Sequence, residues 1–232
     1  MIMTILLDIE GTTTPIDFVH KTLFPFAAEH LAQYITANFA DLGREIEELT
    51  AEHSVDDEYT GDLDTSSADS VSAYLKFLIE RDRKSTPLKS IQGKIWKAGY
   101  ENGELRSEIF DDVPPAFNRW RAEGRRIAIY SSGSVLAQKL LFGYTETGDL
   151  TPFIDSYFDT NVGAKRETAS YRRIAGSLGE TPANILFVSD IVAELDAARS
   201  SGFSTVLSVR PGNAPEEGGH AHPTITSFDE IA

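Results

Sequence analysis

The sequence predicts an α/β fold: a Rossmann-like parallel sheet core with an inserted all-helical cap domain. From residue 126 to residue 209, short apolar strands alternate with helical patterns, which is typical of parallel strands joined by crossover helices. One more apolar, β-favouring run lies far upstream at residues 4–9, and the stretch between, 17–113, shows helices but no strand. The first strand therefore belongs with the later ones. We expect a core of residues 1–16 plus 114–232 and a cap of residues 17–113.

Composition excludes several classes of protein. The chain has 232 residues, which at about 150 residues per domain suits one domain with an insert. Its 41% hydrophobic and 25% charged residues are ordinary for a soluble globular protein. The absence of cysteine excludes disulfides, thiolate nucleophiles and Cys-ligated zinc or iron–sulfur clusters, and it suits a reducing compartment. A net charge of −15 argues against nucleic-acid binding.

The amino-terminal segment predicts neither a signal peptide nor a membrane anchor. Its apolar run is too short to span a bilayer, has no basic residues before it and reaches Asp8 almost at once. No later window has the apolar length of a membrane helix. We expect a cytoplasmic protein without membrane contact, and the acidic composition suits a soluble monomer.

Charge is distributed unevenly along the predicted cap. Residues 41–70 carry eleven Asp and Glu against the single Arg44, whereas residues 76–97 carry seven Lys and Arg against two acids. The basic segment suits either a small anionic ligand or a solvated helix face, and charge alone does not choose between them.

The elements of the predicted cap follow from periodicity and from proline. Helices are expected at 18–39 with a break or kink at Pro25, at 41–52, at 69–82, and from Pro87 through Trp96. Residues 53–70 are acidic and poor in apolar side chains, so we expect a loop or mobile segment there.

The elements of the predicted core are short and regular. A helix runs from Pro114 and Pro115 to a stop at Gly124. Strands are then expected at 126–130, 154–159, 185–189 and 204–209, with helices after Ser134, at 167–178 and at 191–201. The segment 211–223, rich in Gly, Pro and His, is expected to be a loop.

Carboxylates and hydroxyls follow three of these strands at their carboxyl ends, where doubly wound sheets bind ligands. The first strand ends with Asp8 and Glu10, which are followed by Gly11. A carboxylate at the end of a buried strand is poorly explained by packing, so its position suggests a functional role. The alternative is that Asp8 merely caps a loop. Ser131-Ser132-Gly133-Ser134 follows the next strand as either an anion site or a helix N-cap, which Ser134 or Ser132 would supply.

The third strand end carries Ser189 and Asp190, with Glu194 four residues later. Asp190 suits either a ligand of a hard cation facing Asp8 or the cap of the next helix. Lys165 stands alone in the sequence, and by itself it predicts only a solvated side chain.

Taken in order, Asp8-x-Glu10-Gly-Thr12, Ser131 or Ser132, Lys165 and Asp190 resemble the four motifs of the haloacid dehalogenase superfamily. Longer strings resemble the enolase-phosphatases of methionine salvage: Leu6–Ile16, Asp82–Lys89, Gln92–Gly93, Tyr130–Ser134, Gln138–Gly143 and Arg210–Asn213. The likeness covers nearly the whole chain apart from residues 41–70. Two details depart from the superfamily pattern, since Glu10 replaces the usual Asp and no clean acidic pair follows Asp190.

The resemblance implies an Mg²⁺-dependent phosphatase that forms an aspartyl-phosphate on Asp8. Glu10 would protonate the leaving oxygen and later activate water, because it lies two residues from the nucleophile. One Mg²⁺ would be held by the carboxylates of Asp8 and Asp190 and the backbone carbonyl of Glu10. Ser131 or Ser132 and Lys165 would bind the remaining phosphoryl oxygens. Glu194 would then support the metal ligands without binding the metal itself.

The implied substrate is 2,3-diketo-5-methylthiopentyl-1-phosphate, which is enolised and dephosphorylated to the acireductone 1,2-dihydroxy-3-keto-5-methylthiopentene. The enolisation base is either Glu10 or a lysine of residues 76–97. Two alternatives stay open: a phosphatase with the same nucleophile and another small phosphomonoester, and a binding protein with a degenerate site. Nucleotide-binding glycine motifs are absent from the sequence.

Overall fold

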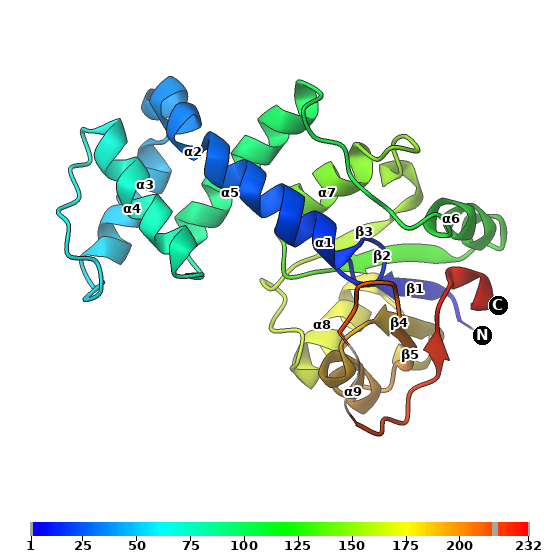
Figure 1. The fold of residues 1–232 in the computed structure, drawn as a ribbon. Coiled ribbons are helices and arrows are strands. Elements are labelled where there is room, and N and C mark those ends of the chain that lie inside the picture. Colours follow the sequence, from blue (N-terminus) through cyan, green and yellow to red (C-terminus); the bar gives the residue numbers. More distant parts are fainter. Residues whose placement is uncertain (1, 215–217, 232) are drawn as a thin grey trace. The chain divides into compact units, whose positions relative to one another are not determined.

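The computed structural model describes residues 2–214 and 218–231 (Figure 1). The chain divides into two compact units. One consists of Met1–Val19 together with Arg106–Ala232, and the other of His20–Leu105. We refer to them as the core unit and the cap unit and describe each by itself.

A six-stranded, wholly parallel sheet forms the centre of the core unit (Figure 1). Its strands are β1 (Thr4–Leu7), β2 (Arg126–Tyr130), β3 (Ser156–Phe158), β4 (Ile185–Ser189), β5 (Ser204–Ser208) and β6 (Thr224–Ile225). Their spatial order is β3-β2-β1-β4-β5-β6, so the chain builds outward from β1 on one side and then returns to build on the other. The order therefore reverses beside β1, where ligands bind in such sheets.

Helices of the core unit bury the apolar faces of these strands. They are α6 (Val113–Ala122), α7 (Val135–Gly143), α8 (Thr168–Leu178) and α9 (Val192–Ser200). Side chains of α8 and α9 form one buried cluster with β1, β4 and β5; this cluster includes Leu6, Tyr171, Phe187 and Leu195. β1 is buried at every residue, as a central strand covered on both faces should be.

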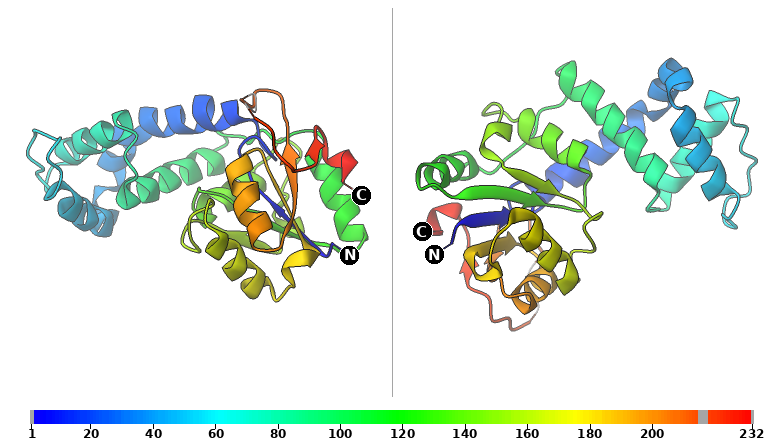
Figure 2. Two further views of the ribbon diagram at one scale, coloured as in Figure 1. Left: turned by 90° about the horizontal axis from the view of Figure 1, so that it is seen from below. Right: turned by 180° about the vertical axis from the view of Figure 1, so that it is seen from behind.

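Four longer helices form the cap unit. They are α2 (Phe24–Asn38), α3 (Gly43–His53), α4 (Ala68–Glu80) and α5 (Thr86–Glu101). The short α1 (Ile16–Phe18) and a π-helical turn (Val19–Leu23) precede α2 at the boundary of the units. In Figure 2, α2 and α5 run side by side. Apolar residues of all four helices share one buried cluster, with Leu31, Leu49, Tyr74 and Ile91 among them.

The acidic and basic segments of the cap unit form ion pairs with each other. Lys94 Nζ lies 2.7 Å from Glu45 Oε1, and Arg83 lies within 3.3 Å of carboxylate oxygens of both Asp56 and Glu58. Residues of the predicted acidic loop are thereby tied to the basic stretch that follows it.

Several predicted boundaries differ from the observed ones. The helix expected at 18–39 is interrupted, because the π-helical turn precedes Pro25, which occupies the first turn of α2. β1 ends at Leu7, two residues earlier than expected, because the chain turns there. The sequence did not predict β6 or the 3₁₀ turn Phe228–Glu230; β6 has only two residues, too few to show periodicity. Within the predicted loop 211–223, residues 215–217 lie outside the described residues.

Within residues 2–214 and 218–231, no helix combines the length and apolar character needed to cross a membrane.

Candidate active site

Asp8 is the first residue after β1, at the edge of the sheet where all the parallel strands end. Leu7 pairs in register with Ile129 of β2 and Val188 of β4, so Asp8 leaves the sheet between two neighbouring strands. Its backbone N–H donates to the carbonyl of Val188 at 3.0 Å. Asp8 as a whole is 5% exposed, and its Oδ1 accepts from the N–H of Ile9 at 2.8 Å. A carboxylate at this position is rigidly held.

The loop that follows, residues 8–14, is closed by backbone hydrogen bonds, one of them from the N–H of Gly11 to the carbonyl of Thr14 at 2.8 Å. The N–H groups of Thr12, Thr13 and Thr14 all donate to the carbonyl of Ile9, at 3.1, 2.9 and 3.0 Å. Gly11 adopts a φ of +66°, in the left-handed region that disfavours side chains. Glu10, the predicted acid and base, is half-buried in this loop and pairs as an isolated bridge with Thr14.

Gly11 also allows a close approach by Asp190. A Cβ at Gly11 would lie 2.5 Å from Asp190 Oδ2. We therefore expect Gly11→Ala to lower the free energy of unfolding by about 1–2 kcal/mol through its positive φ alone, and to displace Asp190 as well. Urea unfolding followed by circular dichroism measures this loss.

Gly43→Ala is the matched control, because a Cβ at Gly43 meets nothing within 4 Å at the start of α3. This control should be neutral or slightly stabilising. Equal unfolding free energies for the two variants would contradict the role assigned to Gly11.

Lys165 lies between two buried carboxylates. Its Nζ is 2.6 Å from Asp8 Oδ1 and 2.6 Å from Glu194 Oε2, and its side chain is only 10% exposed. Burial by itself lowers the pKa of Lys165, but the charges of Asp8 and Glu194 outweigh burial, so the pKa is raised. Lys165 is therefore a fixed positive charge beside Asp8. The expectation of a solvated lysine, drawn from this residue alone, is wrong.

The segment that carries Lys165 is anchored from the sheet and from α8. Tyr130 Oη donates to the carbonyl of Gly163 at 2.9 Å, and Tyr171 Oη donates to the carbonyl of Lys165 at 2.6 Å. Ser170 Oγ donates to the carbonyl of Ala164 at 2.7 Å. These bonds explain how a loop residue reaches Asp8 with a defined geometry.

Asp190 and Glu194 complete a cluster of acids around Lys165. Burial, followed by the charge of Asp8, raises the pKa of Asp190 to about 7. The same two causes raise the pKa of Glu194, against the opposing effect of Lys165. Ser189 Oγ lies 3.0 Å from Glu194 Oε2 and 3.3 Å from Asp8 Oδ2. Two carboxylates thus contact the ammonium of Lys165, and Asp190 interacts with it through its charge, so the fully ionised cluster has an excess of negative charge.

The raised pKa of Asp190 gives the metal-free protein a pH-dependent stability. Between the unfolded value of 3.8 and the folded value of about 7, the folded chain holds a proton that the unfolded chain releases. The free energy of unfolding should therefore fall as pH rises through this window and level off above it. Urea titrations in EDTA at several pH values between 4.5 and 8 should show this fall.

Asp190→Asn is the matched comparison, because it removes the titrating carboxyl and keeps its shape. The fall with pH should be clearly smaller in this variant. Parallel pH profiles for the variant and the wild type would contradict the assignment to Asp190.

The serine motif after β2 takes part in a helix cap, but not through the residues predicted to bind phosphate. Ser134 caps α7 by accepting from the N–H of Ala137, which leaves Ser131 and Ser132 without that task. Ser131 is buried and Ser132 is exposed. Ser131 Oγ accepts from the N–H of Gly133 at 3.2 Å. Because β2 neighbours β1, both serines lie at the edge of the sheet that carries Asp8.

The structure thus brings Asp8, Lys165, Asp190 and Glu194 into one cluster, with Glu10 in the adjoining loop. Gln138 had no predicted role. Its Nε2 donates to the carbonyls of Gly133 and Phe158, at 2.8 and 2.9 Å, and holds the serine loop against the end of β3. Only its place in the string Gln138–Gly143 distinguished it in the sequence.

The site's residues fit a hard divalent cation. Across the described part of the chain, no group of three or more His, Cys, Asp or Glu side chains is arranged to hold a metal ion. Magnesium, however, is usually bound by one or two carboxylates and keeps several waters. Asp8 and Asp190 supply two carboxylates, and the negative excess of the cluster favours a cation there.

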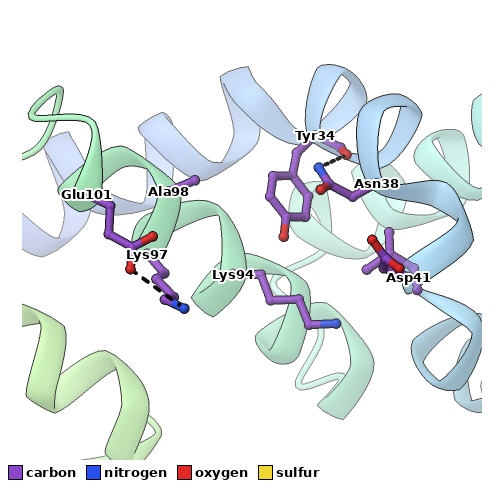
Figure 3. A pocket seen from close by; sticks show the side chains of 8 residues that line it. Tyr34, Asn38, Asp41, Lys94, Lys97, Ala98 and Glu101 are labelled. Atoms are coloured by element: carbon purple, nitrogen blue, oxygen red, sulfur yellow. Dashed lines mark hydrogen bonds and ion pairs between the residues drawn. The ribbon is translucent and has the colours of Figure 1, made fainter.

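A separate hollow of about 370 Å³ lies in the cap unit between α2 and α5 (Figure 3). Tyr34 and Asn38 line it from α2, and Lys94 and Lys97 line it from α5. Each lysine has a carboxylate partner, since Lys94 pairs with Glu45 and Lys97 lies 3.6 Å from Glu101. The hollow therefore offers no excess positive charge for a phosphate group.

Comparison with known proteins identifies the family. A family model of the haloacid dehalogenase-like hydrolases matches residues 2–202. The enolase-phosphatase E1 of Synechococcus elongatus is 54% identical over 235 residues, which cover 99% of this chain and 98% of that protein. The enolase-phosphatase E1 of Leptospira borgpetersenii is 52% identical, over 97% of this chain and 96% of that protein.

Among solved structures, the UTR4 protein of Saccharomyces cerevisiae matches with a TM-score of 0.82 at 36% identity, over 99% of this chain and 100% of that one. CbbY from Rhodobacter sphaeroides, solved with phosphate, matches with a TM-score of 0.61 at 20% identity, over 100% and 96% of the two chains, and shows the fold alone. The fold class and the resemblance predicted from the sequence are confirmed: the chain belongs to the enolase-phosphatase family of the haloacid dehalogenase-like hydrolases.

Proposed function

We propose that this enolase-phosphatase converts 2,3-diketo-5-methylthiopentyl-1-phosphate to the acireductone 1,2-dihydroxy-3-keto-5-methylthiopentene and phosphate, as a step of methionine salvage. The observation that carries the proposal is the carboxylate of Asp8 at the switch point of the sheet, 2.6 Å from the buried ammonium of Lys165. Family membership supplies the substrate class, and the site supplies groups for both steps.

In the phosphatase step, a carboxylate oxygen of Asp8 attacks phosphorus. The bond from phosphorus to the ester oxygen breaks, and Glu10 gives a proton to that leaving oxygen. Water then attacks the aspartyl-phosphate, Glu10 takes a proton from this water, and phosphate leaves with Asp8 restored. Both roles of Glu10 suit its place in the loop that begins at Asp8.

Charge on the transferred phosphoryl group requires neutralisation, since phosphoryl transfer depends chiefly on positioning and electrostatics. Lys165 is fixed beside the nucleophile for this purpose, and Ser131 and Ser132 offer hydroxyls at the same edge of the sheet. We assign the phosphate-binding role to these three residues.

Members of this superfamily typically depend on Mg²⁺. We propose that one Mg²⁺ is held by the carboxylates of Asp8 and Asp190 and the backbone carbonyl of Glu10. When bound, the ion neutralises phosphoryl charge and polarises the ketone next to the phosphate-bearing carbon. Glu194, which contacts Lys165 and Ser189, orients the lysine and is not assigned as a metal ligand.

For the enolisation, we propose Glu10 as the base that removes the proton from the phosphate-bearing carbon. The lysines of residues 76–97 are the competing candidates; among them Lys94 is already paired with Glu45. Exchange of the substrate's C1 proton with solvent reports this step separately from phosphate release. Glu10→Gln should slow this proton exchange. If the variant exchanges the proton at the wild-type rate, the base is a lysine of residues 76–97 instead of Glu10.

The whole proposal is tested by incubating the purified protein anaerobically with the diketo-phosphate and Mg²⁺ while phosphate release and enol absorbance are followed together. Coupled appearance of both signals, abolished by EDTA, is the expected result. Phosphate release without enol absorbance would indicate a phosphatase with another natural substrate, and it would contradict the proposed enolase activity. The cytoplasmic location and monomeric state expected from the sequence stay predictions.

A further inference from the structure

The segment that follows β5 holds the backbone of the nucleophile loop. Arg210 Nε donates to the carbonyl of Thr12 at 3.2 Å, and Asn213 Nδ2 donates to the carbonyl of Gly11 at 3.0 Å. The same amide also donates to the carbonyl of Ser208 at 3.3 Å, which ties it to the end of β5. Two successive carbonyls of the loop are thus fixed by side chains that lie 198 and 202 residues later in the chain.

Arg210 has an evident structural role. It is buried, its Nη1 pairs with Asp112 Oδ2 at 2.8 Å, and its guanidinium carbon lies 4.8 and 4.6 Å from the ring centres of Phe110 and Phe228. These contacts occupy the arginine within the core unit.

Arg210 Nη2 and Asn213 Oδ1 are both buried without a hydrogen-bond partner among the described residues, but the group of Asn213 is an acceptor. The amide nitrogen Nδ2 of Asn213 donates both of the bonds described above, while Oδ1 is buried and accepts from no donor among residues 2–214 and 218–231. A buried acceptor without a donor is costly, and a bound water or ion is one explanation for such a group in a native protein.

The position of this oxygen indicates what its partner is. Asn213 Oδ1 lies 2.9 Å from the point that a Cβ of Gly11 would occupy, and Asp190 Oδ2 lies 2.5 Å from the same point. Two acceptor oxygens therefore approach the same side of Gly11. With Asp190 ionised, neither its carboxylate nor the amide oxygen of Asn213 carries a proton to donate, so a third group has to donate to them.

We propose that Asn213 Oδ1 accepts a hydrogen bond from a water molecule bound to the divalent cation, and that Asn213 is thereby a positioning residue for the metal site. The inference rests on the proposed function, in which Asp190 is a ligand of that cation. One side chain then joins the Gly11 carbonyl to the hydration shell of the ion. Mutation of a residue that hydrogen-bonds to a metal ligand typically changes the metal affinity by about 10- to 100-fold.

The test measures Mn²⁺ affinity without substrate, from the electron paramagnetic resonance signal of free Mn²⁺. Asn213→Ala and Asn213→Asp both lose the donor to Gly11, but only Asn213→Ala loses the acceptor. We expect affinity to fall about tenfold or more in Asn213→Ala, and to be at least that of the wild type in Asn213→Asp. Asn118→Ala is the matched control, because Asn118 is exposed on α6 and donates to the carbonyl of Pro114 in the same helix, so this variant should bind Mn²⁺ as the wild type does.

Equal weakening in both Asn213 variants would show that the residue only holds the loop, and it would overturn the proposal. Unchanged affinity in Asn213→Ala would also overturn it. If the wild type binds Mn²⁺ no better than Asp190→Asn, the cation site of the proposed function fails together with this inference, whereas the product assay still tests the phosphatase step. Circular dichroism verifies folding, and Asn213→Leu replaces Asn213→Ala if the latter does not fold.

Discussion

Asp8→Asn should abolish phosphate release, with a loss of roughly 10⁴-fold or more in kcat, as is found when a catalytic nucleophile is removed. The amide oxygen can still accept from the N–H of Ile9 and from Lys165, so the local geometry should survive. The substitution also removes one of three carboxylates around a single ammonium, so the folded state should not lose stability. Steady-state phosphate release and thermal unfolding test the two halves of this prediction.

A covalent intermediate provides the sharper measurement. Rapid quenching of the wild type with substrate labelled in the phosphoryl group should trap label on the protein, and Asp8→Asn should trap none. Asp57→Asn is the matched control, since Asp57 is exposed in the cap unit. Label trapped equally in wild type and Asp8→Asn would place the nucleophile elsewhere, even if turnover were reduced.

Lys165→Met should impair both activity and folding, because it removes the only ammonium within the cluster of described residues Asp8, Asp190 and Glu194. Removing one partner of a buried ion pair typically costs about 3–5 kcal/mol. Loss of a group that stabilises developing charge typically costs about 10²- to 10³-fold in kcat. The measurements are phosphate release and urea unfolding, the latter in EDTA.

The pH dependence separates this electrostatic effect from a simple loss of packing. The pKa values of Asp190 and Glu194 are already raised, and both should rise further without Lys165. The stability difference between Lys165→Met and wild type should therefore be large at pH 8 and shrink at pH 5, where Asp190 holds a proton. Lys89→Met is the control, since Lys89 is exposed on α5. A difference that stays constant with pH would contradict the electrostatic explanation.

Much of the fold could be predicted because its signals are local. β2 and β4 were predicted with their observed bounds, since a fully buried parallel strand is a continuous apolar run ended by turn residues. Helix starts at Pro87 and Pro114 were equally clear, because proline favours the first turn. β6 was missed, since two residues carry no period.

The candidate site could be predicted only where its residues follow strands. Asp8, Ser131 and Asp190 each come within two residues of a strand end, so the topology of a parallel sheet brings them to one edge. Lys165 had no such signal, and only the resemblance to a family singled it out.

The sequence by itself determined the order of strands and helices, the family and the nucleophile candidate, because apolar periodicity and short motifs are properties of neighbouring residues. Only the tertiary structure decided that Lys165 lies between Asp8 and Glu194, that burial raises the pKa of Asp190, and that Asn213 reaches the carbonyl of Gly11. These features depend on distances between segments far apart in the chain. Charge interactions and desolvation act through space, so no local pattern of residues encodes them.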